Sequence, residues 1–484
     1  MDCKIVFFVL GKVAMACAIG LTVPCMAAFV LGEESLLAFI TAIIVSVFVG
    51  RGLMGYGHRP ADSLTDREGI AITALTWIMV TFLGMIPYAV GGYLSILDSV
   101  LECISGLSGT GATVLNDIEV LPQSLLLWRS MTHWFGGLGI IVIFIALFPQ
   151  IGRGTVHMFN AESTGPTEDN RMLPRLREMA KALFAVYITF TLAASIVFTC
   201  CGMSPIVAVD HAMSTIATGG FSTYNDSIAH FNSPVIEGWI VFFMILSSAN
   251  FGMYVAAWRK GWKVIVRDVE FRTYIGIVIT ATLLMAANLV CQQGWQGTEA
   301  LRQALFQATS LSSSTGFVSS DFDQWPAFSK AIILLLMFIG GCAGSTAGGF
   351  KVTRIILLIK TMKAIIGMKL HPRMVLHVHS NGDEFSEDIL YGVARFFFVY
   401  AMLDVLWTVL LVFDGVAVFD AVGVSISTMG SCGPAFGQFG ATCTYSSLPV
   451  MSKVVVCISM LMGRLESFTV LALLMPSFWR KSNW

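Results

Sequence analysis

Apolar stretches of membrane-spanning length recur along the chain and are separated by short polar segments. An α-helix needs about 20 apolar residues to cross a bilayer. We expect spans at Ile5–Val30, Leu36–Val49, Ile70–Val90, Met131–Phe148, Ala182–Cys201, Val235–Trp258, Tyr274–Cys291, an interrupted stretch from Phe328, Val393–Phe413 and Val450–Met475. The pattern therefore predicts an all-α polytopic membrane protein.

Four polar segments between these spans have related sequences. They are Ser-Gly-Thr-Gly-Ala-Thr at 108–113, Thr-Gly-Gly-Phe-Ser-Thr at 218–223, Ser-Thr-Gly-Phe-Val-Ser at 314–319 and Ser-Cys-Gly-Pro-Ala-Phe at 431–436. Aligned on Gly111, Gly220, Gly316 and Gly433, each has a small residue two positions earlier and a serine six positions earlier. This recurrence predicts a fourfold internal repeat of about 100 residues.

Each repeat is interpreted as a span, a half-helix, a glycine segment and a second span. The predicted half-helices are Ile96–Leu107, Pro205–Ala217, Glu299–Leu311 and Asp420–Met429. The predicted divisions are an N-terminal helix pair at 1–55 and repeats at 56–150, 151–260, 261–365 and 366–484, the third with a broken second helix.

A glycine beside Ser or Thr lets the backbone extend with its carbonyl groups on one side, because no Cβ blocks the required dihedral angles. Four such segments around one axis would form a ring of carbonyl oxygens, which can replace the hydration shell of an alkali cation. Ordinary loops between membrane helices are the simpler alternative for any one segment, but not for four in phase. The candidate ion-binding residues are Thr110, Gly111, Thr218, Gly219, Gly220, Ser314, Thr315, Gly316, Ser431, Cys432 and Gly433.

The composition excludes a soluble globular protein. Of the 484 residues, 56% are hydrophobic and only 12% are charged, whereas soluble domains carry about 25% charged residues. Most of the 29 Lys and Arg lie in alternate loops. The positive-inside rule then places both termini in the cytosol and opens the glycine segments to the outside.

The second span of the third repeat is interrupted by five glycines within Gly340–Gly349. Each glycine costs a helix about 1 kcal/mol relative to alanine, so we expect a flexible loop at membrane depth rather than only close helix packing. Arg464 is a charge within the last span, where ionisable residues are usually functional. The candidate gate residues are Gly344, Ser345, Thr346, Ala347, Gly348, Gly349 and Arg464.

Other polar residues carry weaker signals. Carboxylates near the starts of the half-helices are expected to cap them, to attract cations, or both; they are Asp98, Glu102, Asp210, Glu299 and Asp420. The eleven cysteines form no C-x-x-C pair, and Cys432 with Cys443 is the one pairing considered. No catalytic motif such as H-E-x-x-H is present, so we expect no enzyme, no bound cofactor and no nucleic-acid partner.

Several motifs resemble the TrkH/KtrB branch of the Trk/Ktr/HKT potassium transporters over nearly the whole chain. They are Gly111-Ala112-Thr113-Val114, Leu127-Trp128-Arg129-Ser130, Trp134-Phe135-Gly136-Gly137-Leu138-Gly139-Ile140, Gly344-Ser345-Thr346-Ala347-Gly348-Gly349 and Gly463-Arg464-Leu465-Glu466. The extra N-terminal helix pair favours the TrkH side. Two departures concern selectivity: Ser108-Gly109-Thr110 replaces a run of threonines, and Gly430-Ser431-Cys432 stands where asparagines are common.

The resemblance implies potassium uptake across a bacterial plasma (inner) membrane by a homodimer with one pore per subunit. It also implies a cytosolic ring of nucleotide-binding regulatory subunits, and a gating loop at Gly344–Gly349 beside Arg464. Potassium would bind at Thr110, Gly111, Gly219, Gly220, Thr315, Gly316, Cys432 and Gly433. Gly111 favours potassium, because sodium-conducting plant relatives can carry serine there.

Two alternatives stay open at this point. One is coupling of potassium transport to sodium or protons, which no residue pattern decides. The other is a secondary transporter of another solute, which would show two inverted halves with discontinuous helices in corresponding positions. This sequence instead shows four parallel copies and one predicted broken span.

Overall fold

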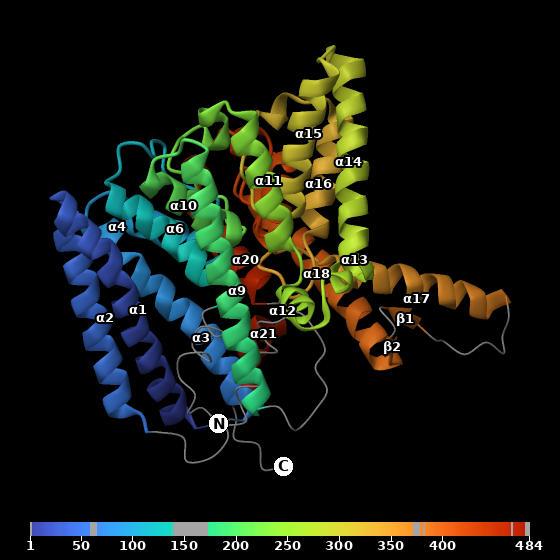
Figure 1. The fold of residues 1–484 in the computed structure, drawn as a ribbon. Helices are drawn as coiled ribbons and strands as arrows, with labels where there is room; N and C mark the ends of the chain where they lie inside the picture. The colour runs from blue at the N-terminus through green and yellow to red at the C-terminus, as the bar shows by residue number, and fades with distance from the viewer. Residues whose placement is uncertain are drawn as a thin grey trace.

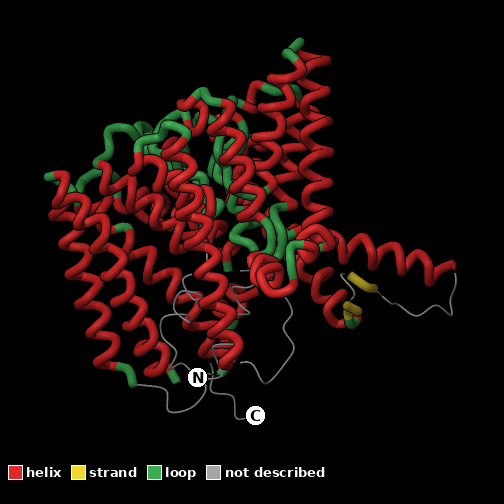
Figure 2. The backbone as a smooth tube through the Cα atoms, viewed as in Figure 1, coloured by secondary structure: helices red, strands yellow, loops and turns green. Residues whose placement is uncertain are grey.

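The computed structural model describes residues 2–58, 65–137, 139, 173–370, 378–380, 383–465 and 468–479. This part of the chain is almost entirely helical, with loops reaching between the helices into the interior (Figures 1 and 2). Six of its helices are long and apolar enough to span a membrane, or seven if one bent pair counts as a span. The all-α fold class predicted from the sequence is confirmed. The β-structure of the described residues is a short ribbon of β1 (Val378–Ser380) antiparallel to β2 (Asp383–Phe385).

The N-terminal hairpin consists of α1 (Cys3–Leu31) and α2 (Leu36–Tyr56) at one edge of the molecule (Figure 1). The two helices approach closely at glycines, because a Cβ added to Gly11 would lie 2.7 Å from the carbonyl oxygen of Gly50. Small residues allow this kind of contact in membranes. The second helix is longer than predicted and continues past Val49 to Tyr56.

Each of the four later units contains the elements in the predicted order. The first spans are α3 (Asp66–Gly84) with α4 (Ile86–Val90), α9 (Leu173–Cys200), α14 (Val269–Gln293) and α18 (Glu387–Phe413). The half-helices are α5 (Ile96–Ser108), α10 (Pro205–Ile216), α15 (Gly297–Ser312) and α19 (Val418–Gly430). The second spans begin with α6 (Gln123–Gly137), α11 (Pro234–Ser248), α16 (Ala327–Ile339) and α20 (Val450–Arg464).

Shorter helices complete the description. They are α12 (Phe251–Lys260), α13 (Lys263–Arg267), α17 (Val352–Leu370), α21 (Phe468–Leu474), α22 (Pro476–Trp479) and the 3-10 turns η1 (Ser227–Phe231), η2 (Phe322–Gln324), η3 (Gly437–Phe439) and η4 (Tyr445–Ser447). Parts of two predicted spans, at 140–148 and 466–467, lie outside the described residues, as does the predicted repeat boundary at 150.

Within the described residues two second spans are broken, whereas the sequence predicted one. In the third repeat, α16 ends at Ile339 and helix resumes only with α17, which runs away from the bundle (Figure 1). In the second repeat, α11 and α12 meet at an angle of 86°. This break contains neither Gly nor Pro, and is stabilised by polar caps instead: Asn250 Oδ1 accepts from Gly252 N at 2.8 Å, and Phe251 N donates to Gly344 O at 2.9 Å.

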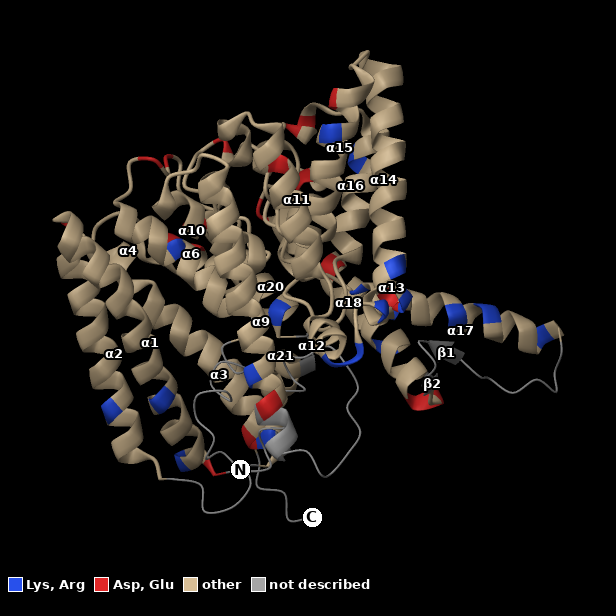
Figure 3. Ribbon diagram, viewed as in Figure 1, with Lys and Arg blue, Asp and Glu red and all other residues tan. Residues whose placement is uncertain are grey.

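Charged residues are unevenly distributed (Figure 3). Lys and Arg gather at the end of the molecule where α1 begins and along α13 and α17, whereas Asp and Glu dominate the loops at the opposite end. This separation is the one that the positive-inside rule describes.

Candidate functional site

The four half-helices end in the same turn. In each, the carbonyl oxygen of the serine identified from the sequence accepts a hydrogen bond from the backbone N–H five residues later: Ser105 from Thr110 (3.0 Å), Ser214 from Gly219 (2.9 Å), Ser310 from Thr315 (2.8 Å) and Ser427 from Cys432 (2.9 Å). The residue before each donor is left-handed: Gly109 (φ 73°), Thr218 (φ 55°), Ser314 (φ 53°) and Ser431 (φ 54°). This combination is the Schellman helix end, and it explains why a small residue recurs there.

The aligned glycines bring the four segments together around one axis. All four have positive φ. A Cβ added to any of them would collide with a backbone carbonyl oxygen of the next segment, that of the residue just before its aligned glycine. The distance from the added Cβ to that oxygen is 2.0 Å for Gly111 and Gly219 O, 2.0 Å for Gly220 and Thr315 O, 1.9 Å for Gly316 and Cys432 O, and 2.5 Å for Gly433 and Thr110 O. The contacts run from the first repeat to the fourth and return to the first, so the ring is closed.

A cavity of about 110 Å³ lies on one side of this ring. All four glycines line it, together with polar side chains such as Asn116, Ser222 and Asn225. The cavity is therefore partly polar and touches all four segments.

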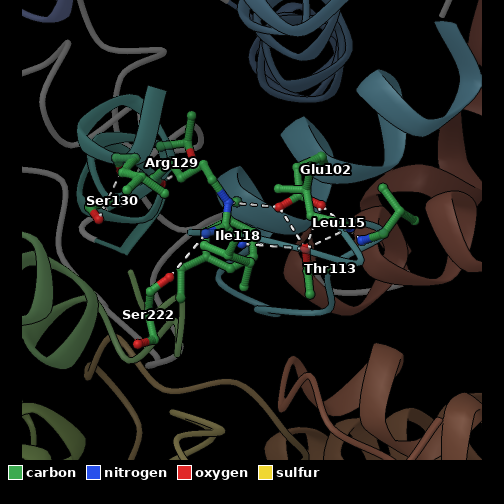
Figure 4. A network of polar contacts seen from close by, with 12 residues as sticks. Glu102, Thr113, Leu115, Ile118, Arg129, Ser130 and Ser222 are labelled. Atoms are coloured by element: carbon green, nitrogen blue, oxygen red, sulfur yellow. Dashed lines mark hydrogen bonds and ion pairs between the residues drawn. The ribbon is translucent and has the colours of Figure 1, made fainter. Parts of the chain in front are cut away.

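A buried ion pair supports the first two segments (Figure 4). Arg129 Nε lies 2.9 Å from Glu102 Oε1, and the two side chains are 1% and 0% exposed. Glu102 also accepts from Thr113 Oγ1 and Val114 N, each at 3.0 Å, while Arg129 Nη1 donates to Ser222 O at 3.1 Å. The pair therefore ties α5 and α6 to both segments.

This ion pair was not predicted from the sequence. Glu102 and Asp210 were expected at half-helix starts, but both lie inside their half-helices and are buried. Asp98, Glu299 and Asp420 do lie in first turns, but none of them is the N-cap of its half-helix, a place that Ser95, Gln296 and Ala417 occupy. An acidic residue in α5 and a basic residue in α6 were the available signal, but only the packing of the two helices shows that they meet.

The glycine-rich loop between α16 and α17 lies against the other side of the ring. Thr346 Oγ1 donates to Ile216 O at 3.0 Å, and Gly348 N donates to Ser314 Oγ at 2.5 Å. A Cβ on Gly348 would lie 2.4 Å from Gly430 O. The loop thus contacts the ends of the second, third and fourth half-helices, opposite the cavity.

Charged side chains hold this loop, among them Arg464, Lys351, whose Nζ donates to Ala347 O, and Glu270. Arg464 donates from Nη1 to Thr346 O at 3.1 Å, and from Nη2 to Gly136 O and Gly137 O at 2.5 and 2.8 Å. The structure therefore brings together Arg464 and the loop, which the sequence had paired. Glu466, which stands two residues after Arg464, lies outside the described residues.

Glu270 was not singled out from the sequence. It lies in the first turn of α14, and its Oε1 accepts from Ala343 N at 2.6 Å and from Thr353 N at 3.2 Å. These two donors flank the loop, so one carboxylate joins both ends of the break. An acidic residue at the start of an apolar span, close to the N-cap Asp268, was the only sequence signal.

The cysteines of the described residues form no disulfide. Cys432 is buried in the ring and Cys443 is exposed, and both are free. Nor do the described His, Cys, Asp and Glu side chains form a group that could hold a metal ion.

Comparisons with known proteins agree on one family. The family of cation transport proteins named TrkH matches residues 35–481. The chain is 36% identical to the Trk system potassium uptake protein TrkH of Salmonella typhimurium, over 92% of each chain. It is 34% identical to the protein of that name from Vibrio parahaemolyticus, over 99% of this chain and 100% of the relative. The crystal structure of the potassium transporter TrkH from Vibrio parahaemolyticus superposes with a TM-score of 0.89 at 32% identity, covering 99% of this chain and 100% of that one.

Proposed function

Because this chain belongs to the TrkH family of cation transport proteins, we propose that it takes up potassium across a bacterial plasma membrane through the ring of four glycine segments. The family consists of transporters and not of enzymes. The observation that carries the proposal is the closed ring, in which each glycine lies so near a carbonyl of the next segment that a Cβ would not fit. Carbonyl rings of this kind replace the hydration shell of potassium.

The half-helices add a favourable field. The C-terminal end of a helix carries a partial negative charge, and all four half-helices end beside the ring. A cation is therefore the charge type that the centre of the molecule stabilises. The proposed ligands are the backbone carbonyls of the segments around Thr110, Gly219, Thr315 and Cys432.

The loop at Gly344–Gly349 is proposed as the gate. It lies under three half-helix ends, it contains few large side chains, and Arg464 holds it against the second span of the first repeat. A loop with little packing of its own can open at modest cost. The repeat boundaries stay a proposal: the breaks and half-helices fall within them, whereas α2 ends one residue past 55 and α17 continues from the third repeat to Leu370.

The function is tested with purified protein in liposomes. Potassium flux is measured with and without an imposed sodium or proton gradient. Flux selective for potassium supports the proposal, and a change with either gradient identifies a symporter. Flux of neither potassium nor sodium would leave a secondary transporter of another solute as the function.

A first prediction concerns Glu270. Replacing it with alanine removes the acceptor of two backbone N–H groups, and hydrogen bonds to a charged group contribute about 1.5–3 kcal/mol. We expect Glu270→Ala to raise basal potassium flux by about tenfold, because the closed loop loses the hydrogen bonds that join Ala343 and Thr353 to one carboxylate. The matched control is Asp268→Asn, which removes a carboxylate two residues away while an asparagine still caps α14 at Phe271 N. Equal flux from both variants would exclude Glu270 from the gate.

A homodimer and a cytosolic ring of nucleotide-binding subunits are proposed as partners, with the basic end of the molecule as the docking face (Figure 3). The side chains of Arg175 and Arg177 in this region lie outside the description, whereas Lys263 and Arg267 on α13 are described and exposed. Membrane orientation under the positive-inside rule would by itself account for basic residues on this face, without any docked partner.

Charge reversal distinguishes these two explanations. We expect Lys263→Glu with Arg267→Glu to lower co-purification of the ring severalfold, because a rim charge pair is replaced by repulsion. Reversal of Lys4 and Arg51 on the peripheral hairpin serves as the control. Unchanged binding after reversal on α13 would place the docking face elsewhere.

A further inference from the structure

The second glycine segment differs from the other three at the residue that precedes the aligned glycine. Thr110, Thr315 and Cys432 stand there in the first, third and fourth repeats, and Gly219 stands there in the second. The two threonine hydroxyls are each 2.7 Å from the hydroxyl of a serine two residues earlier, Ser108 or Ser313. The second segment has Ala217 in place of that serine and so lacks this internal support.

His133 fills the space that a side chain at position 219 would need. Its ring is 0% exposed, and a Cβ added to Gly219 would lie 2.3 Å from both Cγ and Nδ1 of the imidazole. Such an approach is impossible without moving the ring. Position 219 is therefore a glycine because a residue from α6 occupies the volume used by the threonine side chain elsewhere.

The imidazole also joins two neighbouring quadrants of the ring. Nδ1 lies 2.8 Å from Gly106 O in the first half-helix, and Nε2 accepts from Phe221 N at 3.3 Å in the second segment. A carbonyl oxygen only accepts and a backbone N–H only donates. The imidazole of His133 is therefore neutral, with its proton on Nδ1. Its centroid lies 4.1 Å from that of the Phe221 ring.

We propose that His133 is a specificity-determining positioning residue, which replaces the missing hydroxyl pair and sets the place of the Gly219 carbonyl and of Gly220 in the ring. The inference rests on the proposed potassium pathway. His133 does not touch the ion in this assignment; it acts through the backbone of the second segment. Without it, that quadrant is free to shift, and discrimination between potassium and sodium falls.

The test is an exchange of one support for the other. His133→Phe keeps a ring but removes both nitrogens, and we expect the potassium-to-sodium flux ratio in liposomes to fall by about tenfold, since two buried hydrogen bonds are lost. Gly219→Thr alone is expected to abolish selective flux, because the new side chain meets the imidazole. The combination His133→Ala, Ala217→Ser and Gly219→Thr builds the serine–threonine pair of the first and third repeats, and we expect it to restore the ratio to within about threefold of wild type.

The outcomes separate the inference from the function on which it rests. Wild-type protein that passes potassium no better than sodium would overturn the proposed function. Selective wild type with an unchanged ratio in His133→Phe would overturn the role of His133. If the single variants do not fold, the triple variant decides, because a folded but unselective triple variant also overturns the exchange. A His230→Ala variant, at an exposed histidine, controls for loss of an imidazole.

Discussion

A Gly111→Ser variant is expected to lose selective potassium uptake. Gly111 has φ of 80°, and its Cβ position lies 2.0 Å from Gly219 O. A serine would add the left-handed strain of about 1–2 kcal/mol and would also force apart two segments of the ring. We expect the potassium-to-sodium ratio to fall by at least about tenfold. The measurement is growth of a potassium-uptake-deficient strain at low potassium, together with sodium uptake.

Gly109 provides the matched control in the same segment. Its φ is 73°, but the nearest atom to its added Cβ is 3.9 Å away. The other repeats carry Thr218, Ser314 and Ser431 at this place in the same conformation. Gly109→Ser should therefore retain selectivity near that of wild type. If the two serine variants behave alike, backbone strain and not the closed ring explains the glycines, and the filter assignment fails.

Removal of the Arg464 side chain is expected to produce the second large effect. A unit charge about 6 Å from a passing cation opposes it by roughly 3 kcal/mol at an effective dielectric constant of about 20. This barrier corresponds to roughly a hundredfold in rate. The guanidinium also holds the loop through Thr346 O while anchored at Gly137 O. We expect Arg464→Ala to raise basal potassium flux by up to about a hundredfold without any cytosolic partner.

Arg464→Lys separates the two contributions. Lysine keeps the positive charge but cannot donate in the planar fork that reaches three carbonyls. Flux near wild type in the lysine variant would assign the barrier to the positive charge. Flux near that of the alanine variant would assign it to the hydrogen bonds of the guanidinium. Deletion of Gly344–Gly348 is expected to raise flux as well. Flux at or below wild type in both the alanine and the deletion variants, with normal amounts of folded protein, would remove the loop and Arg464 from the gate.

The turn at each half-helix end shows why the repeat was readable in the sequence. A Schellman end needs a residue that tolerates positive φ, and the close approach of the next carbonyl needs a glycine two residues later. These are local requirements on residue type, so they recur wherever the turn recurs. The half-helices and the third-repeat break were predictable for the same reason, since apolar length and clustered glycines act within one segment.

Contacts between segments were not readable in this way. The break after Ser248 has one local feature, the N-cap Asn250, but its other hydrogen bond comes from Gly344 in a distant loop. Glu102 and Arg129 are 27 residues apart, and Glu270 is 73 residues from Ala343. Each of these carboxylates is buried or half-buried with a partner that only the packing of separate helices supplies.

The sequence by itself determined the class of protein, the family, the four segments and the loop with its arginine. Those features follow from composition, from hydrophobic length and from backbone conformations that only certain residues adopt. Tertiary structure alone decided that the four segments close into one ring in chain order, and that His133 takes the place of a side chain at Gly219. Close packing and hydrogen bonds between two segments depend on both of them, so they cannot be inferred from the residues of either segment alone.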